Sequence, residues 1–286
     1  MICLDDVWKS YDGRPALRGV TLHIDPGEAV LLTGPSGAGK STLLRLVYMA
    51  EYADAGEVTV AGRSLGRLRR SSIPYVRRNI GVVFQDFRLM PERTALENVA
   101  VSAEVLALPR KEVLARARAA LEAVGFDEDV NRPVRVLSGG LQQRVAIARA
   151  LCGDPPILLG DEPTGNLDPS RAQEVLELLE AIRSRGTTLL VATHDPTVVA
   201  FGMAHGWRRA ELQDGQIIAG GRPARELLAQ SEANAGIAVG PLGEAETAPL
   251  RRDSASGRPA LVTAERSLDL PIEVDTSAVE EIRGHP

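Results

Sequence analysis

The sequence is poor in cysteine and has no long apolar run. These two shortages argue against a cysteine-based metal site and against a membrane-spanning protein. Cys3 and Cys152 are the only thiols among its 286 residues, and neither has a second ligand at metal-binding spacing. Two lone thiols fit a reducing cytosol, so we interpret both as ordinary buried small residues. No apolar run approaches the roughly 18–20 residues of a membrane-spanning helix. Residues 1–10 carry early acids and no basic leader, which does not resemble a secretory signal.

Lysine is also scarce. Only three of the 33 basic residues are lysine, namely Lys9, Lys40 and Lys111, so arginine supplies the positive charge almost everywhere. A lysine in the middle of a glycine-rich loop, as Lys40 is, therefore indicates a need for a compact ammonium group. Acidic residues outnumber basic ones, and the net charge of −5 argues against a partner that is a nucleic acid.

Strand-like and helix-like patterns alternate through residues 1–221. Apolar–polar alternation or short apolar runs predict strands at 1–11, 16–24, 29–34, 56–62, 80–84, 157–163 and 187–195. Helical periodicity is found at 39–50, 92–153 and 171–184. A last hairpin over 206–218 is expected to turn at Asp214 and Gly215.

This alternation predicts an α/β fold with a parallel sheet covered by helices on both faces. The long helical segment interrupts the alternation, so we expect an inserted helical subdomain at about 86–153 within one domain of residues 1–221. After residue 221 the composition shifts towards Ala, Gly, Pro and Ser. We expect residues 222–286 to be a largely disordered extension, with a short helix at about 222–236.

The segment GPSGAGKST fits the phosphate-loop pattern G-x-x-x-x-G-K-[ST]. It follows a predicted strand and opens a predicted helix, which is the context that the motif requires. Its glycines allow backbone N–H groups to face an anion, and the helix N-terminus adds the positive end of its dipole. Lys40 can reach the β- and γ-phosphates, and the Ser41 hydroxyl can ligate Mg²⁺. The residues expected to bind ATP in this loop are Gly34, Pro35, Ser36, Gly37, Ala38, Gly39, Lys40, Ser41 and Thr42.

Two carboxylates follow a second apolar strand, at the sheet edge where ligands of α/β proteins bind. Asp161 suits the Mg²⁺ shell, and Glu162 suits a base that polarises the attacking water. His194 ends another apolar strand and is expected to face the γ-phosphate, although a lone histidine is more often incidental. Tyr11 ends the first strand and could stack on a purine ring, or could be an ordinary surface tyrosine.

A second anion-binding pattern lies in the helical segment. In LSGGLQQR, Ser138, Gly139 and Gly140 precede a strongly helical stretch, with Ser138 as the expected N-cap. Because the motif belongs to the inserted helices, we do not expect it to reach the nucleotide of its own chain. A head-to-tail pair solves this problem, because the Ser138 loop of each chain can then close over the ATP of the other at one isologous interface.

In this order the motifs resemble those of the ATP-binding cassette ATPases: Tyr11, GPSGAGKS, Gln85, LSGGLQQ, ILLGDEP, GNLD and His194. The resemblance covers residues 1–221. It implies a P-loop NTPase fold with a RecA-like α/β core, an antiparallel β subdomain and an inserted helical subdomain. It also implies ATP and Mg²⁺ as ligands, ATP hydrolysis, and a homodimer that forms on ATP binding. Asp168 becomes part of the inter-subunit loop, and Gln85 becomes a catalytic sensor that links Mg²⁺ to the helical subdomain.

Two positions depart from the family pattern. Leu141 stands where the family usually has Gln or Glu, which removes a polar group near the ATP of the other chain and puts the strength of dimer closure in question. Gly160 replaces the usual Ala before the Asp-Glu pair, and we expect it only to loosen the strand.

The stretch QDFRLMPERT, from Gln85 to Thr94, is informative about partners. In this family the segment after the sensor glutamine contributes to a groove for a helix of a membrane partner. Phe87, Leu89 and Met90 would suit such a helix, unless Phe87 and Leu89 pack only internally. The stretch resembles the cell-division branch of the family, whose four-span membrane partner passes the ATP cycle to cell-wall hydrolases. This implies a location at the cytoplasmic face of the inner membrane.

Three other functions are compatible with parts of the pattern. Lipoprotein-release and macrolide-efflux ATPases share DEPTGNLD but usually have a different run after the glutamine. A DNA-maintenance ATPase needs a long coiled-coil insertion, and residues 42–137 are too few for one. A module that binds ATP as glue without hydrolysing it is disfavoured by Glu162 and His194.

Overall fold

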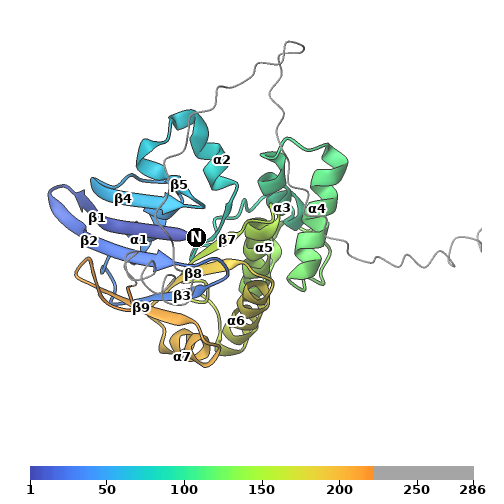
Figure 1. Cartoon of the computed structure of the whole chain (residues 1–286). Coiled ribbons are helices and arrows are strands. Elements are labelled where there is room, and N and C mark those ends of the chain that lie inside the picture. The colour runs from blue at the N-terminus through green and yellow to red at the C-terminus, as the bar shows by residue number, and fades with distance from the viewer. Residues whose placement is uncertain (222–286) are drawn as a thin grey trace, which may run out of the picture. The chain divides into compact units, whose positions relative to one another are not determined.

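The computed structural model describes residues 1–221, and the fold is that of this part of the chain. Two β-sheets form its body, with helices around them (Figure 1). The smaller sheet has the strand order β2-β1-β4-β5, and the larger has the order β10-β9-β3-β8-β7-β6. The strands are β1 (Ile2–Tyr11), β2 (Arg14–Ile24), β3 (Ala29–Thr33), β4 (Ala55–Val60), β5 (Arg63–Ser64), β6 (Ile80–Val83), β7 (Ile157–Asp161), β8 (Thr188–Thr193), β9 (Arg208–Gln213) and β10 (Gln216–Ala219).

The smaller sheet is antiparallel, with β1 between β2 and β4. Ile2 pairs with Ile24 on one side and with Val60 on the other. In β1, Ile2 and Leu4 are fully buried while Asp5 and Asp6 are exposed. Alternation of this kind is expected of an antiparallel sheet with one face against a core.

The larger sheet is parallel from β9 to β6, and β10 joins its edge in the antiparallel direction. Strands β3 and β8 are buried along their whole length, which fits a parallel sheet covered on both faces. Parallel pairing also brings the carboxyl ends of β3, β7 and β8 to the same edge. The residues that follow Thr33, Asp161 and Thr193 therefore meet there.

The helices of residues 1–221 are α1 (Lys40–Val47), α2 (Ile73–Arg77), α3 (Ala95–Glu104), α4 (Arg110–Ala123), α5 (Gly139–Leu151), α6 (Pro169–Ser184) and α7 (Pro196–Ala204), with short 3-10 helices at Leu65–Arg67, Arg70–Ser72 and Val134–Val136. Helices α3, α4 and α5 follow one another between β6 and β7 and pack together. Helix α3 starts in a capping box, in which the Thr94 hydroxyl accepts from the Glu97 N–H and the Glu97 carboxylate accepts from the Thr94 N–H.

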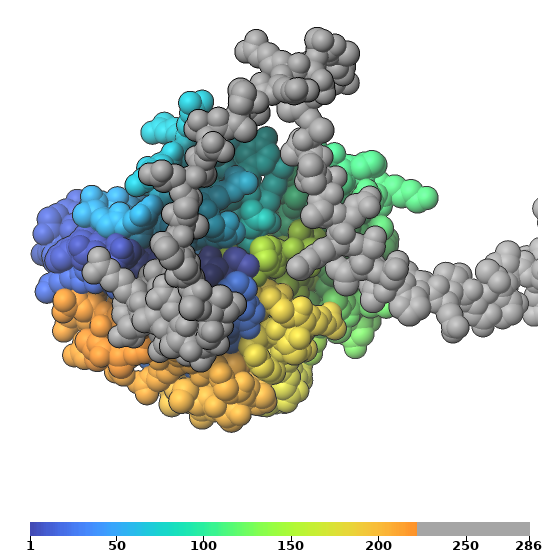
Figure 2. Space-filling model, viewed as in Figure 1, coloured from blue at the N-terminus to red at the C-terminus, as the bar shows by residue number. Residues whose placement is uncertain are grey.

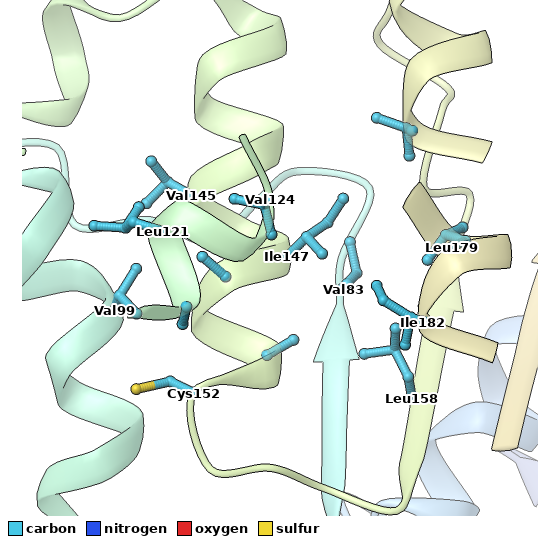
Figure 3. Packing of buried hydrophobic residues seen from close by; sticks show 14 of the residues in the cluster. Val83, Val99, Leu121, Val124, Val145, Ile147, Cys152, Leu158, Leu179 and Ile182 are labelled. Atoms are coloured by element: carbon cyan, nitrogen blue, oxygen red, sulfur yellow. The ribbon is translucent and has the colours of Figure 1, made fainter. Parts of the chain in front are cut away.

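Two hydrophobic clusters hold these elements together. The larger cluster joins the sheet to α3, α4, α5 and α6. In Figure 3, Val83 of β6 and Leu158 of β7 lie between Ile147 of α5 and the α6 residues Leu179 and Ile182. The second cluster joins the two sheets around α1. Helix α5 is therefore fixed to the strand that ends at the predicted carboxylate pair.

The structure agrees with most of the predicted elements. The hairpin of β9 and β10 turns at Asp214 (φ 48°) and Gly215 (φ 79°), the two left-handed residues of a type I′ turn, as expected. Helices α2 and α7 are not predicted by the sequence pattern. The predictions for residues 222–286, including the helix at 222–236, lie outside the described residues. Within residues 1–221 no helix has the length and apolar character needed to cross a membrane.

Candidate nucleotide-binding site

The phosphate loop connects β3 to α1 and lies close against β9. Gly34 allows this approach, because a Cβ atom there would lie 2.0 Å from the carbonyl oxygen of Leu212. Lys40 is the first residue of α1, and its ammonium group donates to the carbonyl oxygens of Gly34 (2.7 Å) and Pro35 (3.1 Å). The only lysine of the loop is therefore buried and directed along the backbone of the loop.

Asp161 ends β7 beside the start of α1. The Ser41 hydroxyl donates to its Oδ1 atom at 3.0 Å. Burial raises the pKa of the Asp161 carboxyl, and the Ser41 hydrogen bond opposes that rise. Hydroxyl and carboxylate oxygens suit Mg²⁺, which commonly takes one or two protein ligands and completes its shell with water and phosphate oxygens. Within residues 1–221 there is no cluster of three or more His, Cys, Asp or Glu that could hold a metal ion.

Glu162 follows β7 with a left-handed backbone (φ 50°) that turns it towards β8. The Thr193 hydroxyl donates to its Oε2 atom at 3.1 Å, and His194 Nδ1 lies 2.6 Å from its Oε1 atom. Lys40 Nζ is 4.0 Å from the same Oε1 atom. Only 11% of the Glu162 side chain is exposed, against 64% for His194. A carboxylate oriented in this way can accept a proton from a water molecule within hydrogen-bond reach of it.

A cavity of about 350 Å³ lies over these groups, which is within the usual range for small-molecule sites. Its lining consists of Tyr11, Ala16, Ser36, Gly37, Gly39, Lys40, Ser41, Thr42, Gln85, Glu162 and His194. The fold thus gathers most of the residues predicted to bind ATP from distant parts of the chain. Gly34, Pro35 and Ala38 do not line the cavity, and Asp161 contacts it through its bond to Ser41.

Tyr11 ends β1 at the rim of this cavity, with 37% of its surface exposed. Its hydroxyl donates to the Glu51 carboxylate. Burial, with a smaller contribution from Glu51, raises the pKa of the Tyr11 phenol. The ring is thus fixed at the cavity, and its stacking on a purine stays a prediction.

Asn166 of the GNLD motif holds Gln85 through its backbone, and Arg149, which belongs to none of the sequence motifs, holds the turn that follows Gln85. Asn166 Nδ2 donates to the Gln85 carbonyl oxygen at 2.7 Å. The guanidinium of Arg149, near the end of α5, donates to the carbonyl oxygens of Phe87 (2.6 Å) and Arg88. Phe87 and Arg88 both have left-handed backbones (φ 58° and 49°), which no glycine in the sequence signals. The arrangement connects the Gln85 segment to α5.

The LSGG motif lines a different cavity, of about 280 Å³, that shares no lining residue with the first. Ser138, Gly140 and Leu141 line it, and Gly139 is the first residue of α5. The Ser138 hydroxyl accepts from the Leu141 N–H at 3.5 Å, so the predicted N-cap is confirmed. Ser138 is exposed and both glycines are half-buried, whereas Leu137 is buried.

Asp168 lies next to this second cavity. It caps α6 by accepting from the Arg171 N–H at 3.1 Å, and its Oδ2 atom is 3.3 Å from Arg171 Nε. Arg171 itself lines the second cavity together with Ser138. The GNLD loop and the LSGG motif therefore border one surface.

Leu141 and Gly160, which depart from the family pattern, both lie in packed surroundings. Leu141 packs against the larger hydrophobic cluster. At Gly160 a Cβ atom would lie 3.2 Å from Pro163 Cγ, so alanine would be tight. Gly160 thus relieves a close contact with Pro163, a packing role that the sequence alone does not reveal.

The carboxyl edge of the larger sheet is built as in the P-loop nucleotide-binding proteins. Comparison with known proteins narrows this class. A family model described as ABC transporter matches residues 17–165. The chain belongs to this family and is an ABC-type ATPase domain.

Curated relatives from several bacteria carry the name "Cell division ATP-binding protein FtsE". The protein from Streptococcus pneumoniae serotype 2 (strain D39) is 46% identical over 200 residues, which cover 70% of this chain and 87% of the relative. The protein from Escherichia coli (strain K12) is 43% identical over 222 residues, 77% of this chain and 98% of the relative. The protein from Mycobacterium tuberculosis is 47% identical over 201 residues, 70% of this chain and 87% of the relative.

Solved structures agree with the predicted fold class. A dimeric ATP-binding cassette in a post-hydrolysis state, bound to ADP and Pi, matches with a TM-score of 0.70 and 38% identity, covering 77% of this chain and 97% of that one. A dimeric bacterial ABC transporter cassette matches with a TM-score of 0.70 and 39% identity over the same shares. The prediction of an ABC-type α/β fold is therefore confirmed.

Proposed function

We propose that this protein is the ATP-hydrolysing subunit of an FtsEX-like membrane complex that acts in cell division. One observation carries the proposal most directly: Lys40, Glu162 and His194 meet in a single cavity over the phosphate loop. The FtsE name of relatives with 43–47% identity supports the cell-division role. The complex would use its ATP cycle to control cell-wall hydrolysis outside the membrane.

In the proposed reaction, the phosphate loop and Lys40 bind the phosphates of ATP, and Tyr11 stacks on the purine ring. Ser41, Asp161 and Gln85 hold Mg²⁺. An ion held there would supply positive charge to offset the negative charge of the transferred phosphoryl group. Lys40 is suited to its role because its ammonium group is already directed along the loop backbone, at 2.7 Å from the Gly34 carbonyl oxygen.

Glu162 is proposed as the base that takes a proton from the attacking water. Its two oxygens are held by Thr193 and His194, so the carboxylate has one orientation. His194 would contact the γ-phosphate from its exposed side. Gln85 is proposed as the third catalytic residue and as the sensor of the ion. Asn166 fixes its backbone directly, and Arg149 fixes the adjacent turn, so the position of Gln85 depends on α5.

The protein is proposed to act as a homodimer that forms on ATP binding. Ser138, Gly139, Gly140 and Asp168 would then contact the ATP of the other chain. Two observations support this: the LSGG cavity is separate from the chain's own phosphate-loop cavity, and similar cassettes have been solved as dimers. A two-fold pair of such chains would hold two ATP molecules at one interface.

The proposed membrane partner is an FtsX-like integral membrane protein that docks near the segment from Gln85 to Thr94. That partner would keep the protein at the cytoplasmic face of the inner membrane. Leu89 packs against the larger hydrophobic cluster, so Phe87 and Met90, both half-buried, are the apolar residues left for docking.

The proposal is tested by capturing the full chain from its own cells in mild detergent and identifying the membrane protein that is captured with it. A single four-span partner would support the cell-division complex. A lipoprotein-release pair or an efflux subunit would replace the cell-division role and leave the proposed ATPase activity intact. ATP hydrolysis by the captured complex, measured as phosphate release, tests the enzymatic part separately.

A further inference from the structure

Tyr11 is the only tyrosine, tryptophan or phenylalanine that lines the phosphate-loop cavity, and it stands at the rim with 37% of its surface exposed. A side chain in such a place has rotamer freedom to lose when a ligand orders it, at a cost of about two- to tenfold in affinity. A ring that is already held in place avoids this cost. The contacts that hold Tyr11 therefore bear on how tightly a nucleotide binds.

Glu51 holds the Tyr11 hydroxyl from outside the cavity. It lies after the end of α1, where Met49 has a left-handed backbone (φ 58°) that turns the chain back towards β1. The Tyr11 hydroxyl donates to Glu51 Oε2, and Arg45 Nη1 lies 3.4 Å from Glu51 Oε1. Glu51 does not line the phosphate-loop cavity, so it can act on a nucleotide only through another residue.

Asp54 fixes the same end of β1 at two more points. Its Oδ2 atom accepts from the Ser10 N–H at 2.7 Å, and its Oδ1 atom accepts from the Lys9 ammonium group at 2.9 Å. Lys9 Nζ lies over the Tyr11 ring, 5.7 Å from the ring centroid. The cation covers one face of the ring, which leaves the other face for a base.

Glu51 also connects the ring to the phosphate loop through α1. Its backbone N–H donates to the Arg45 carbonyl oxygen at 3.3 Å, and α1 begins at Lys40 of the phosphate loop. Strand β1, which carries Tyr11, lies beside β4 (Figure 1), and in Figure 2 the dark blue surface of β1 and β2 adjoins the lighter blue of β4. The ring and the phosphate loop are therefore fixed relative to each other before a nucleotide binds.

We infer that Glu51 is a positioning residue for the nucleotide, because it holds Tyr11 in the orientation in which the ring stacks on the purine. The inference rests on the proposed function, to which it adds the group that fixes the stacking residue. Glu51 lies outside the cavity that holds Glu162 and His194, so it takes no part in hydrolysis. Loss of Glu51 therefore raises the KM for ATP and leaves kcat unchanged.

The first test compares ATP with inorganic tripolyphosphate, which has the phosphates but no base, as ligands of the full chain. Glu51→Ala is expected to weaken ATP binding about fivefold, the cost of ordering the freed ring. Its affinity for tripolyphosphate and its kcat at saturating ATP should stay at the wild-type values. Glu57→Ala, on the exposed part of β4, is the matched control and should bind both ligands normally. Equal losses for the two ligands, or no loss for ATP, would overturn the inference.

A double-mutant cycle separates the hydrogen bond to Tyr11 from other effects of Glu51. In a Tyr11→Phe background the ring has no hydroxyl to hold, so adding Glu51→Ala should cause no further loss of ATP affinity, whereas additive losses would contradict the inference. Glu51→Gln keeps an acceptor oxygen and should retain most of the wild-type affinity. If Tyr11→Ala binds ATP normally, the proposed stacking fails first and takes the inference with it. If Tyr11→Ala binds ATP weakly and Glu51→Ala does not, only the inference fails.

The second test observes the ring directly in the nucleotide-free protein by fluorine NMR. 3-Fluorotyrosine replaces the four tyrosines of the chain, and the signal that Tyr11→Phe removes is that of Tyr11. Glu51→Ala is expected to move this signal towards the shift of a free tyrosine, and Glu57→Ala should leave it in place. A Tyr11 signal that is the same in the wild type and in Glu51→Ala would show that Glu51 does not hold the ring.

Discussion

At the scale of single residues, two neighbouring carboxylates have different surroundings, which suit them to different proposed roles. Asp161 ends β7, and one of its carboxylate oxygens accepts a hydrogen bond from the Ser41 hydroxyl. Burial raises the pKa of this carboxyl. Glu162 takes a left-handed backbone that turns it to β8, where Thr193 and His194 hold its oxygens. One oxygen site is therefore suited to a metal ion and the other to proton transfer.

The raised pKa of Asp161 implies that this residue weakens folding at neutral pH. The contribution of a carboxyl whose folded-state pKa is raised is fully present below its unfolded pKa, near 3.9, and is lost as the pH rises through the folded pKa. Asp161→Asn should therefore raise the melting temperature of the nucleotide-free protein at pH 7, where each ~1 kcal/mol corresponds to about 2–4 °C in a domain of this size.

Thermal melts between pH 4 and pH 8 check this expectation, since the gain should shrink towards pH 4. Asp86→Asn is the matched control, because that carboxylate is 70% exposed and pairs only at the surface. A variant at Asp161 that melts lower than the wild type at pH 7 would show that the carboxylate stabilises the fold.

Glu162→Gln preserves the size of the side chain and removes the proton acceptor. We expect turnover to fall about 10²–10⁴-fold, the usual contribution of a positioned base, while ATP affinity stays within severalfold. Phosphate release and nucleotide affinity are measured on the same preparation. Glu177→Gln, on the exposed face of α6, is the control and should hydrolyse ATP normally. Normal hydrolysis by Glu162→Gln would remove Glu162 from the reaction.

Most of this site could be predicted from the sequence because its residues follow strands that end at the same edge. The phosphate loop, Asp161 and His194 each come directly after an apolar run. The contacts of Arg149 and of Asn166, a residue of the GNLD motif, could not be predicted, because both side chains bind backbone carbonyl oxygens on segments far away in the sequence. Every residue has a backbone carbonyl group, so a contact to one does not depend on the residue type and cannot be recognised in the sequence.

At the scale of elements, α5 connects two parts of the proposed machinery. Its first turn is capped by Ser138 at the second cavity, and its last turn carries Arg149, which holds the Gln85 segment. The end of the helix also lies tightly on β6, since a Cβ atom at Gly81 would be 2.4 Å from the Ala150 carbonyl oxygen. A displacement of α5 would therefore move the Gln85 segment.

Arg149→Met should uncouple the Gln85 segment from α5. The variant loses both hydrogen bonds to the turn at Phe87 and Arg88, so Gln85 is less well positioned towards the ion. Loss of such a supporting contact typically costs 10–100-fold in metal affinity or activity. The Mg²⁺ concentration that gives half-maximal ATP hydrolysis should rise within that range, and Arg149→Lys should have an intermediate effect.

Arg116→Met provides the control for this substitution, because Arg116 forms only an exposed ion pair within α4. If Arg149→Met lowers the melting temperature but leaves the Mg²⁺ dependence unchanged, Arg149 has a structural role and does not position Gln85.

Element length explains what the sequence did not predict at this scale. Strands β3, β7 and β8 were predictable because each is a short apolar run between turn residues. Helix α2 has five residues, which is less than two helical turns and too short for a periodic pattern. Helix α7 is apolar nearly all round, so it shows no amphipathic period either.

At the scale of the whole molecule, the two halves of the proposed ATP site lie on separate cavities of one chain. In a two-fold dimer each site would combine Lys40 of one chain with Ser138 of the other. Lys40→Ala should therefore damage one half of the site and Ser138→Arg the other half. Each variant alone should hydrolyse ATP far more slowly than the wild type, since every site of its dimer is affected.

Mixing these two variants distinguishes a site shared by two chains from a site within one chain. A mixed dimer contains one site with both substitutions and one site with neither. In an equal mixture about half of the dimers are mixed, so activity should recover to about a quarter of the wild-type rate when the sites act independently. The rate of the mixture is compared with the sum of the separate rates at the same total concentration. A mixture no faster than that sum would contradict the shared site, because chains that each complete their own site cannot repair one another.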